Sequence, residues 1–538
     1  MEQQRSISDG TRRVVVWLIG AMALIHLAGL AKLFYLNNGL LFALVDDDSL
    51  ITFRVAYNIA HGIGPFFNRG EHVAASTSLL WPFVIAPVFH HYTLPAAVMF
   101  LSKVSVALTV VILALVAFGA SSVRCAIAGL ATLVALPPFL HYAPTAWEHI
   151  PQTVFTTAAF LPLIRTDGFL KPYALQVCVV LLTVAYLFRP DALPLLTVCA
   201  LVLATDLVRK REKGSFYALG FSIVCIAVYL GVHYHFYASF VPNTYYLKIS
   251  FGFRSLHKGW IYTYNSARQC VAPLFVCASA MLFLADRRAW DRNEKIVLAA
   301  LSAQYLYVLV IGGDVFDSAR FYLLILPIAI LLTYKKIEEQ FFRSPCNLLS
   351  IGAVTLLVIG MLSSEVARQE GDSFAHPYKW SRGQLTTPEV FAADPRLGQL
   401  ELIPVIRDNI RPEDGRIGLF WLGALGYYLP EYTMADFFGK ADPVIAHGPA
   451  KEGWVGQNKW DIDFTLRDRN VAAVPMDRDD QSFKSGEPAD AFEALAVNRY
   501  LKENYVWLSP ESLGVDNWGM YVRKDLVGRF QCASMDAH

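Results

Sequence analysis

Charged residues are scarce in this sequence. Only 17% of the residues are charged, whereas 55% are hydrophobic, and the formal net charge is +1. A net charge this close to zero excludes the overall basic field that nucleic-acid binding requires. Soluble domains usually contain about 25% charged residues. The composition therefore indicates a membrane protein whose partners include a lipid bilayer and no nucleic acid.

The sequence also lacks paired cysteines and a typical signal peptide. Its 8 cysteines form no C-x-x-C pair, so the common zinc and redox motifs are absent. Only Cys532 lies well inside the polar C-terminal region, so no disulfide framework is expected there. The apolar run from Val14 to about Tyr35 holds about 20 residues, enough to span a bilayer and longer than the core of a cleaved signal peptide. We interpret it as a retained first helix.

Long apolar segments recur as far as residue 364 and then stop. They predict a polytopic α-helical membrane domain over residues 1–364, followed by a soluble domain over residues 365–538. Within the second domain, the strand-like runs RIGLFWLG and VAAVPM alternate with helix-like stretches, which predicts an α/β fold. The apolar segments lie at 14–36, 76–92, 95–119, 122–141, 150–164, 172–188, 191–208, 216–239, 269–286, 295–311, 321–334 and 347–364.

The distribution of lysine and arginine predicts the orientation of these helices. Short basic loops stay in the cytoplasm, and three loops are strongly basic: VRKREKG, ADRRAWDRNEK and YKKIEEQFFR. All three fall on the cytoplasmic side only if segment 76–92 does not cross the membrane. That segment is short and contains Pro82 and Pro87, so we interpret it as an interfacial helix within an external first loop, 37–94. About eleven spans then remain, and the C-terminal domain is extracytoplasmic.

The first loop opens with three consecutive acids, Asp46, Asp47 and Asp48. Carboxylates at the mouth of an apolar helix are costly to desolvate. They either take part in function or lie in a solvated loop, and this stretch alone does not decide between the two. The amphipathic stretch Ser49 to Ala60 predicts a helix, with Asn58 and His61 expected at the surface.

Further polar residues fall in loops on the same predicted side. Carboxylates there are able to act as a general base or bind a cation, and arginines are able to bind a phosphate. Each also has a structural explanation: a capped hairpin turn at Arg189-Pro190-Asp191, snorkelling for Lys248 and Arg320, and helix N-terminal placement for Glu148. The polar residues are Trp147, Glu148, His149, Arg189, Asp191, Asn243 to Lys248, Asp314, Asp317 and Arg320.

Taken in order, these motifs resemble membrane-embedded glycosyltransferases of the arabinofuranosyltransferase type. PNTYYLK is similar to a Pro-Asn-Thr-aromatic-aromatic-x-Lys motif of that family, and GGDVFDSAR to its Gly-Gly-Asp element followed by an arginine. In the C-terminal region, ADFFGKADP and GQNKWDID resemble two further family segments. One element departs from the pattern, because Ala146 to His149 read Ala-Trp-Glu-His where the family has a small residue followed by Leu-Glu-Thr. The first-loop signature is matched by Asp47, Asp48, Phe53, Arg54, Gly62, Gly64, Asn68, Gly70, Glu71 and Trp81.

The resemblance implies a glycosyltransferase of the GT-C type in a bacterial cytoplasmic (inner) membrane. Its donor would be a polyprenyl-phosphate sugar, arabinofuranose in the nearest characterised relatives, and its acceptor a glycan or a protein. Asp47 and Asp48 are the catalytic candidates, and Arg189, Lys248 and Arg320 are the candidates for binding the donor phosphate. Arg54, Glu148, Asn243 and Asp314 are the sugar or acceptor candidates.

Two other aspects of the function stay open. No cofactor is required in principle, but a divalent cation (Mg²⁺, Mn²⁺ or Ca²⁺) with oxygen ligands would fit Asp47 and Glu148. The alternatives are a transferase for another polyprenyl-phosphate sugar, of the mannose, glucose or aminoarabinose type, or a membrane transporter. Against a transporter, the sequence shows no internal repeat, and its ionisable residues gather at one predicted surface rather than at the bilayer midplane.

Overall fold

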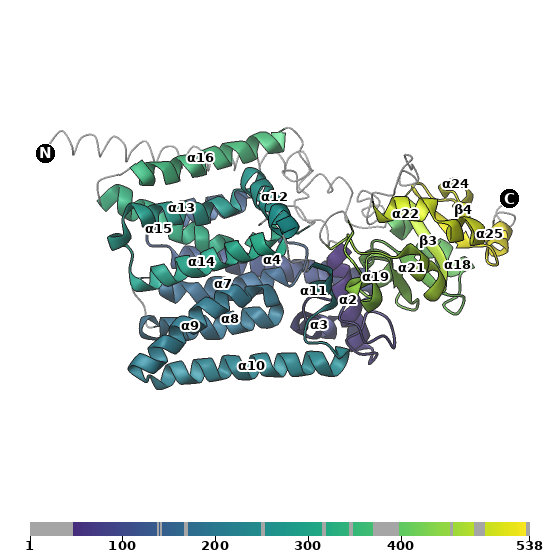
Figure 1. Cartoon of the computed structure of the whole chain (residues 1–538), viewed down its shortest axis with the longest axis horizontal. Coiled ribbons are helices and arrows are strands. Elements are labelled where there is room, and N and C mark those ends of the chain that lie inside the picture. Colours follow the sequence, from purple (N-terminus) through teal and green to yellow (C-terminus); the bar gives the residue numbers. More distant parts are fainter. Residues whose placement is uncertain are drawn as a thin grey trace. The chain divides into compact units, whose positions relative to one another are not determined.

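The computed structural model of the chain is mainly helical, with one small sheet near the C-terminus (Figure 1). It forms two compact units. The first unit is built from described residues between 102 and 229 and between 253 and 369, and the second from 47–101, 230–248 and 398–533. The structure describes residues 47–136, 139, 142–165, 170–248, 253–314, 319–343, 348–369, 398–451, 456–477 and 490–533.

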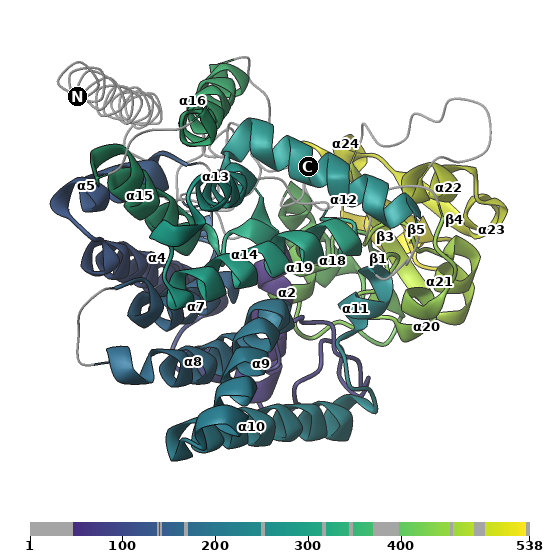
Figure 2. The same cartoon turned by 60° about the vertical axis from the view of Figure 1, so that its left-hand side comes forward.

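The first unit is a bundle of long apolar helices, most of which run side by side (Figures 1 and 2). Apart from α12, their positions agree closely with the apolar segments of the sequence. The predicted first helix, 14–36, lies outside the described residues. The helices are α4 (Leu94–Gly119), α5 (Val123–Ala135), α7 (His149–Ile164), α8 (Ala174–Phe188), α9 (Leu193–Lys210), α10 (Lys213–Tyr237), α12 (Phe253–Cys270), α13 (Ala272–Ala285), α14 (Arg292–Ile311), α15 (Leu326–Arg343) and α16 (Leu348–Gln369).

Several of these helices are long and apolar enough to cross a bilayer. Within the described residues there are 5 such segments, and 6 if a pair bent by 90° between α12 and α13 counts as one span. Helices such as α5 and α16 are apolar but shorter over their apolar part. The fold class predicted from the sequence is confirmed, whereas the count of about eleven spans stays a prediction.

Charged residues gather at the two ends of the bundle. α14 has Glu294 in its first turn and is followed by Asp314, and its 20 residues separate the two ends by about 30 Å. Lys335 and Lys336 pair with Glu294, so they mark one end, which we call the lysine end. The other end, called the arginine end, holds Glu148, Arg189, Asp191, Asp314 and Arg320.

The basic loops that the sequence analysis placed together lie at the lysine end. α7 ends there, because the carbonyl of Ile164 accepts a hydrogen bond from Lys335. α9 also ends there, where Asp206 pairs with Arg292 at the start of α14. The loops therefore share one end of the bundle, as the charge pattern predicts. The cytoplasmic location of that end stays a prediction.

The second unit combines the first loop with the C-terminal region. The first loop forms α2 (Asp47–Ala60), α3 (Leu80–Ile85) and the 3₁₀ turn η1 (Ala86–His90). Segment 76–92 thus contains only a short helix and a 3₁₀ turn, and its place outside the membrane stays a prediction. Residues 230–248 add the end of α10 and the short helix α11 (Asn243–Lys248).

A mixed sheet with the strand order β2-β1-β3-β5-β4 organises the C-terminal region. β1 is parallel to β2 and β3, and β5 is antiparallel to β3 and β4. Aromatic and aliphatic side chains including Phe420, Phe437, Val474 and Leu495 form the core, so the predicted α/β fold is confirmed. The strands are β1 (Arg416–Leu419), β2 (Met434–Asp436), β3 (Val471–Asp477), β4 (Tyr505–Leu508) and β5 (Trp518–Arg523).

The helices of the C-terminal region are short, and most have polar caps. For α20, Asp442 accepts the amide hydrogens of Val444 and Ile445 and also pairs with Arg469. Such caps satisfy donors that a helix leaves unpaired at its start. The helices are α18 (Leu402–Asn409), α19 (Gly423–Tyr428), α20 (Pro443–His447), α21 (Ile462–Asp468), α22 (Ala491–Val497), α23 (Arg499–Asn504), α24 (Pro510–Leu513) and α25 (Val527–Ala533).

One surface prediction for the first loop is wrong. Asn58 is buried, and its amide donates hydrogen bonds to the carbonyls of Phe66 and Phe67. Those carbonyls belong to the loop after Gly62 and Gly64, which both have a positive φ. The amide is buried because it satisfies backbone groups that this irregular loop cannot pair itself. His61, by contrast, is exposed as predicted.

Candidate active site

In the second unit, the predicted catalytic residue Asp47 caps a helix. Its carboxylate accepts hydrogen bonds from the amides of Gly423 and Ala424, at 3.1 and 2.8 Å, at the start of α19. Burial raises the pKa of Asp47 to about 7, against the opposing effect of Lys440. Gly423 is required here, because a Cβ atom would lie 1.8 Å from the carbonyl oxygen of Asp47. Asp47 therefore joins the first loop tightly to the C-terminal region.

Arg54 binds the other end of the same short helix. Its guanidinium donates to the carbonyls of Gly426 at 2.7 Å, Leu429 at 3.0 Å and Tyr432 at 3.2 Å. Arg54 is only 2% exposed, and burial lowers its pKa to about 10, so it stays charged near neutral pH. An acid at the start and a base at the end of α19 both favour its dipole. These contacts favour a structural role for Arg54 over the predicted contact with sugar.

Asp48 differs from both residues, because its carboxylate is partly exposed. It pairs with Lys440 at 2.5 Å, and its side chain is 21% exposed. Burial alone would lower the pKa of Lys440, but the carboxylates of Asp48 and Asp47 raise it above its usual value. Asp436 contributes a third carboxylate near this lysine, and burial raises its pKa to about 6. Asp48 is thus the acid of this group that is best placed to meet a substrate.

The motif PNTYYLK positions this lysine. Asn243 donates to the carbonyls of Gly439 and Lys440, at 2.6 and 3.1 Å, in the loop between β2 and α20. Lys459, from the GQNKWDID stretch, donates to the carbonyl of Tyr246 in α11. Lys248 ends α11, with its Cε atom 3.8 Å from the place that a Cβ atom on Gly456 would take. Asn243 therefore acts on the backbone, and its predicted sugar contact stays untested.

In the first unit, Arg189 lies at the centre of a buried polar cluster. It pairs with Glu148 at 2.7 Å and with Asp191 at 2.9 Å. Gln152 on α7 donates to Asp191 and to the carbonyl of Arg189. Through these contacts, the hairpin between α8 and α9 is fixed to the start of α7. Nε and Nη1 of Arg189 are engaged, whereas no hydrogen bond from Nη2 to a described residue is found.

Arg320 and Asp314 form a second buried pair at this end. The guanidinium of Arg320 lies 4.7 Å from the ring centroid of Trp147 and 5.7 Å from the ring centroid of Phe321. The guanidinium of Arg189 lies 6.0 Å from the same Phe321 centroid. The two arginines thus approach one aromatic ring. The predicted residues Glu148, Arg189, Asp314 and Arg320 are therefore brought together in the first unit, whereas Asp47, Asp48, Asn243, Arg54 and Lys248 belong to the second.

Backbone strain accompanies this cluster. Ala146 and Ala319, which directly precede Trp147 and Arg320, have φ values of 54° and 55°. A non-glycine residue in the left-handed region costs roughly 1–3 kcal/mol and is enriched at functional sites. The surrounding contacts therefore hold both side chains in place against a local preference.

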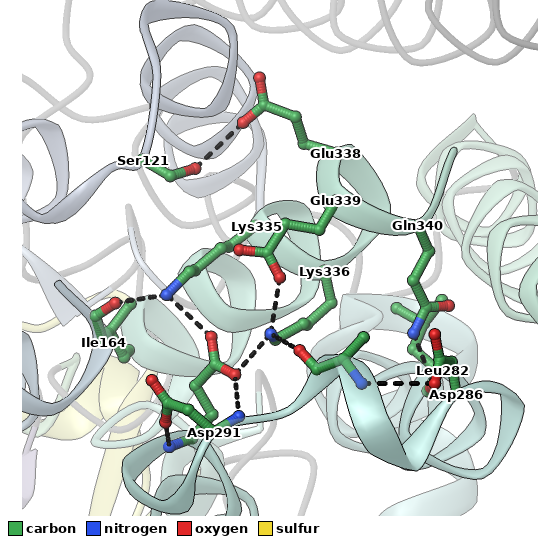
Figure 3. A network of polar contacts seen from close by, with 12 residues as sticks. Ser121, Ile164, Leu282, Asp286, Asp291, Lys335, Lys336, Glu338, Glu339 and Gln340 are labelled. Carbon is green, nitrogen blue, oxygen red and sulfur yellow. Dashed lines mark hydrogen bonds and ion pairs between the residues drawn. The ribbon is translucent and has the colours of Figure 1, made fainter. Parts of the chain in front are cut away.

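The lysine end contains a separate buried network (Figure 3). Lys335 pairs with Glu294 at 2.8 Å, and Lys336 pairs with both Glu294 and Glu339. Lys336 also donates to the carbonyl of Ala289. These lysines are buried, although they form part of a predicted cytoplasmic loop, because α15 continues further than the apolar pattern indicates. The network joins α14 to α15. Each end of the bundle thus contains buried ion pairs.

The described residues supply no group of three His, Cys, Asp or Glu side chains that could hold a metal ion. The two candidate ligands belong to different units. Asp47 accepts backbone amides with both of its oxygens, and Glu148 is bound to Arg189. Both carboxylates are thus engaged with protein partners and do not fit the predicted cation site.

Sequence reasoning missed two residues of these clusters. Lys440 lies in the segment ADFFGKADP, which the sequence analysis compared with a family motif without assigning a role to the lysine. Gln152 follows Glu148 by one helical turn, so its helical spacing is the signal that could have placed it beside the acid.

No family model matches the chain, and no curated protein matches it by sequence. Among solved structures, the chain is similar to ArnT from Cupriavidus metallidurans bound to undecaprenyl phosphate, with 13% identity and a TM-score of 0.48 over 94% of this chain and 97% of that chain. It is also similar to the Archaeoglobus fulgidus oligosaccharyltransferase in the apo form, with 12% identity and a TM-score of 0.40 over 92% of this chain and 73% of that chain. A third similar structure is the oligosaccharyltransferase AglB from Archaeoglobus fulgidus in complex with an inhibitory peptide and a dolichol-phosphate, with 12% identity and a TM-score of 0.39 over 96% and 74% of the two chains.

Proposed function

We propose that the protein is a membrane glycosyltransferase. It transfers a sugar, arabinofuranose in the first instance, from a polyprenyl-phosphate donor to a hydroxyl group of a glycan or protein acceptor. The ordered set of motifs in the sequence supports the class of reaction. The observation that carries the proposal is Asp48, a partly exposed carboxylate that pairs with the half-buried Lys440 and directly follows the buried Asp47.

In the proposed reaction, Asp48 removes the proton from the acceptor hydroxyl. The hydroxyl oxygen then forms a bond to the anomeric carbon of the sugar, and the bond from that carbon to the phosphate oxygen breaks. The electron pair leaves with the polyprenyl phosphate. A positioned general base typically contributes a factor of about 10²–10⁴ to the rate. Asp47 keeps Asp48 in place by fixing the start of α2 on α19.

The departing phosphate requires positive charge, because its negative charge grows as the bond breaks. Arg189, Arg320 and Lys248 are the residues proposed for this role. Arg189 is oriented by Glu148 and Asp191, which leaves Nη2 as the nitrogen for a phosphate oxygen. Arginine suits this task because its planar fork matches phosphate geometry.

The test uses the full chain purified in detergent, with synthetic polyprenyl-phosphate arabinofuranose as the donor. Release of polyprenyl phosphate is measured for the wild type, for Asp48→Asn and for the control Glu431→Gln. Glu431 also forms an ion pair in the second unit, with Arg407 at 2.8 Å. We expect release by the wild type and the control, and a loss of roughly 10²-fold or more in Asp48→Asn.

The other outcomes separate the alternatives. Release from polyprenyl-phosphate hexoses but not from the arabinofuranose donor would retain the reaction and replace the sugar. Equal rates in Asp48→Asn and the wild type would remove Asp48 as the base. If the folded wild type consumes no lipid-linked sugar, the interpretation as a transporter would replace the interpretation as an enzyme.

A further inference from the structure

The helix α12, which the apolar pattern of the sequence did not reveal, has two very different faces. Four large apolar side chains follow one another along one face: Phe253, Leu256, Trp260 and Tyr264 are 86%, 47%, 60% and 57% exposed. Their spacing of three or four residues places them on a single stripe. The stripe is an exposed apolar surface of a kind that marks an interaction site.

The opposite face of α12 packs closely on the bundle. A Cβ atom on Gly259 would lie 2.1 Å from the carbonyl oxygen of Leu309 in α14, so only glycine permits this approach. Thr263 is hydrogen-bonded to Tyr322 at 2.8 Å, and Tyr262 accepts a hydrogen bond from the amide of Phe321. α12 is therefore fixed next to the segment that contains Arg320, with its apolar stripe facing away.

The orientation of α12 relative to the bundle helices indicates what covers the stripe. α12 makes an angle of 90° with the apolar helix α13, and Val271 between them has a φ of 59°. Figures 1 and 2 show α12 crossing the direction of the parallel helices of the bundle. If those helices cross a bilayer, α12 lies parallel to the membrane plane.

The composition of α12 matches that direction. Its 18 residues, FRSLHKGWIYTYNSARQC, contain arginine and lysine but no acid. A helix with basic residues and a stripe of Trp, Phe and Leu is typical of helices that lie in the membrane interface, because the aromatic rings enter the headgroup region and the cations meet anionic lipids. A protein partner would not require the right angle to α13.

We propose that α12 is an interfacial helix whose stripe, Phe253, Leu256, Trp260 and Tyr264, is inserted into the surface of the lipid bilayer at the arginine end. The bilayer is its partner along the whole stripe. The contacts of Tyr262 and Thr263 place the opposite face of α12 next to the segment that contains Arg320. A lipid-linked substrate that arrives through the bilayer therefore meets α12 before it reaches the arginine cluster, a consequence that rests on the proposed function.

The experiment is photo-crosslinking of the full chain in vesicles of phosphatidylethanolamine and phosphatidylglycerol. Separate variants have the photoreactive residue p-benzoylphenylalanine in place of Trp260 or Tyr264. Tyr217, which is 68% exposed on the apolar helix α10, provides the positive control, and Arg499, whose side chain is 91% exposed in the C-terminal region, provides the negative control. Lipid adducts are identified by mass spectrometry, and fragmentation locates the site of attachment on the lipid.

We expect adduct yields at positions 260 and 264 to be as high as at 217, with background yields at 499. The attachment sites should lie in the part of the acyl chain near the headgroup. Adducts near the terminal methyl group would show that α12 enters the bilayer core, and adducts to another protein chain would make the stripe a protein interface. Either result, or background yields at 260 and 264, would overturn the proposal. Because no sugar transfer is measured, its failure is distinguishable from that of the proposed function.

Discussion

Asp47 and Arg54 hold the two ends of α19, and we call these contacts the clamp on α19. The clamp permits a quantitative prediction. Arg54→Met keeps a long aliphatic side chain but removes the guanidinium. The buried carbonyls of Gly426, Leu429 and Tyr432 then lose their donor. An unsatisfied buried carbonyl costs about 1–3 kcal/mol. Water relieves part of this cost, and the third bond is long, so we expect α19 to be destabilised by about 4 kcal/mol.

Hydrogen exchange followed by mass spectrometry measures this change locally. A loss of about 4 kcal/mol corresponds to exchange roughly 10³ times faster for the protected amides of α19, provided that they exchange through local opening. The lysine-end helices belong to the first unit and should keep their protection, because the contacts that are lost all lie within the second unit.

Arg407→Met is the matched control. Arg407 also donates to a carbonyl of α19, that of Tyr428 at 2.9 Å, but its side chain is 47% exposed. Loss of such an exposed contact should cost less than about 1 kcal/mol. Unchanged exchange of α19 in Arg54→Met, or equal effects in the two variants, would refute the argument that burial makes the clamp strong.

Three further predictions concern other contacts. The pKa of Asp47 is raised to about 7, so the folded form binds its proton more tightly than the unfolded form does. The protection of α19 against hydrogen exchange should therefore fall as the pH rises from about 4 to 7 and stay constant above pH 7. Asp47→Asn should flatten this profile, and a wild-type protection that rises over this range would contradict the prediction. Gly259→Ala should lower the thermal midpoint in detergent by several degrees because its Cβ meets α14, whereas Gly220→Ala, which has nothing within 4 Å, should not. Glu294→Gln removes the acid that pairs with Lys335 and leaves Lys336 with Glu339 as its acid partner. The substitution should cost about 3–5 kcal/mol, and an unchanged thermal midpoint would show that this network is not structural.

The sequence was sufficient to locate most of the bundle, because apolar runs of membrane length leave a strong signal. It did not reveal α12, whose apolar residues form a stripe on a helix that also contains basic residues. It also placed Asn58 at the surface, because a polar residue on an amphipathic helix does not show that its amide will pair with loop carbonyls.

The sequence brought forward candidate residues for the site, but it did not indicate what their side chains contact. The motif positions Asp47, Arg54, Asn243 and Lys459 bind backbone groups, which leave no trace in a sequence, since every residue has them. Asp48 differs from its neighbour Asp47 in its greater exposure and in its partner, Lys440. The spacing of residues within each motif could therefore be recognised in the sequence, whereas the backbone groups that these residues bind far along the chain could not.

The clamp also affects how the chain is made. Arg54 and its partner Gly426 are 372 residues apart, so at about 5–20 residues per second a ribosome needs roughly 20–75 s to add the second after the first. During that interval, α2 has been synthesised with a charge that its final environment buries and without the carbonyls that receive it. The first loop therefore has to remain hydrated or protected until α19 emerges. A chain truncated before α19 would retain most of the bundle and yet be unable to complete its first loop.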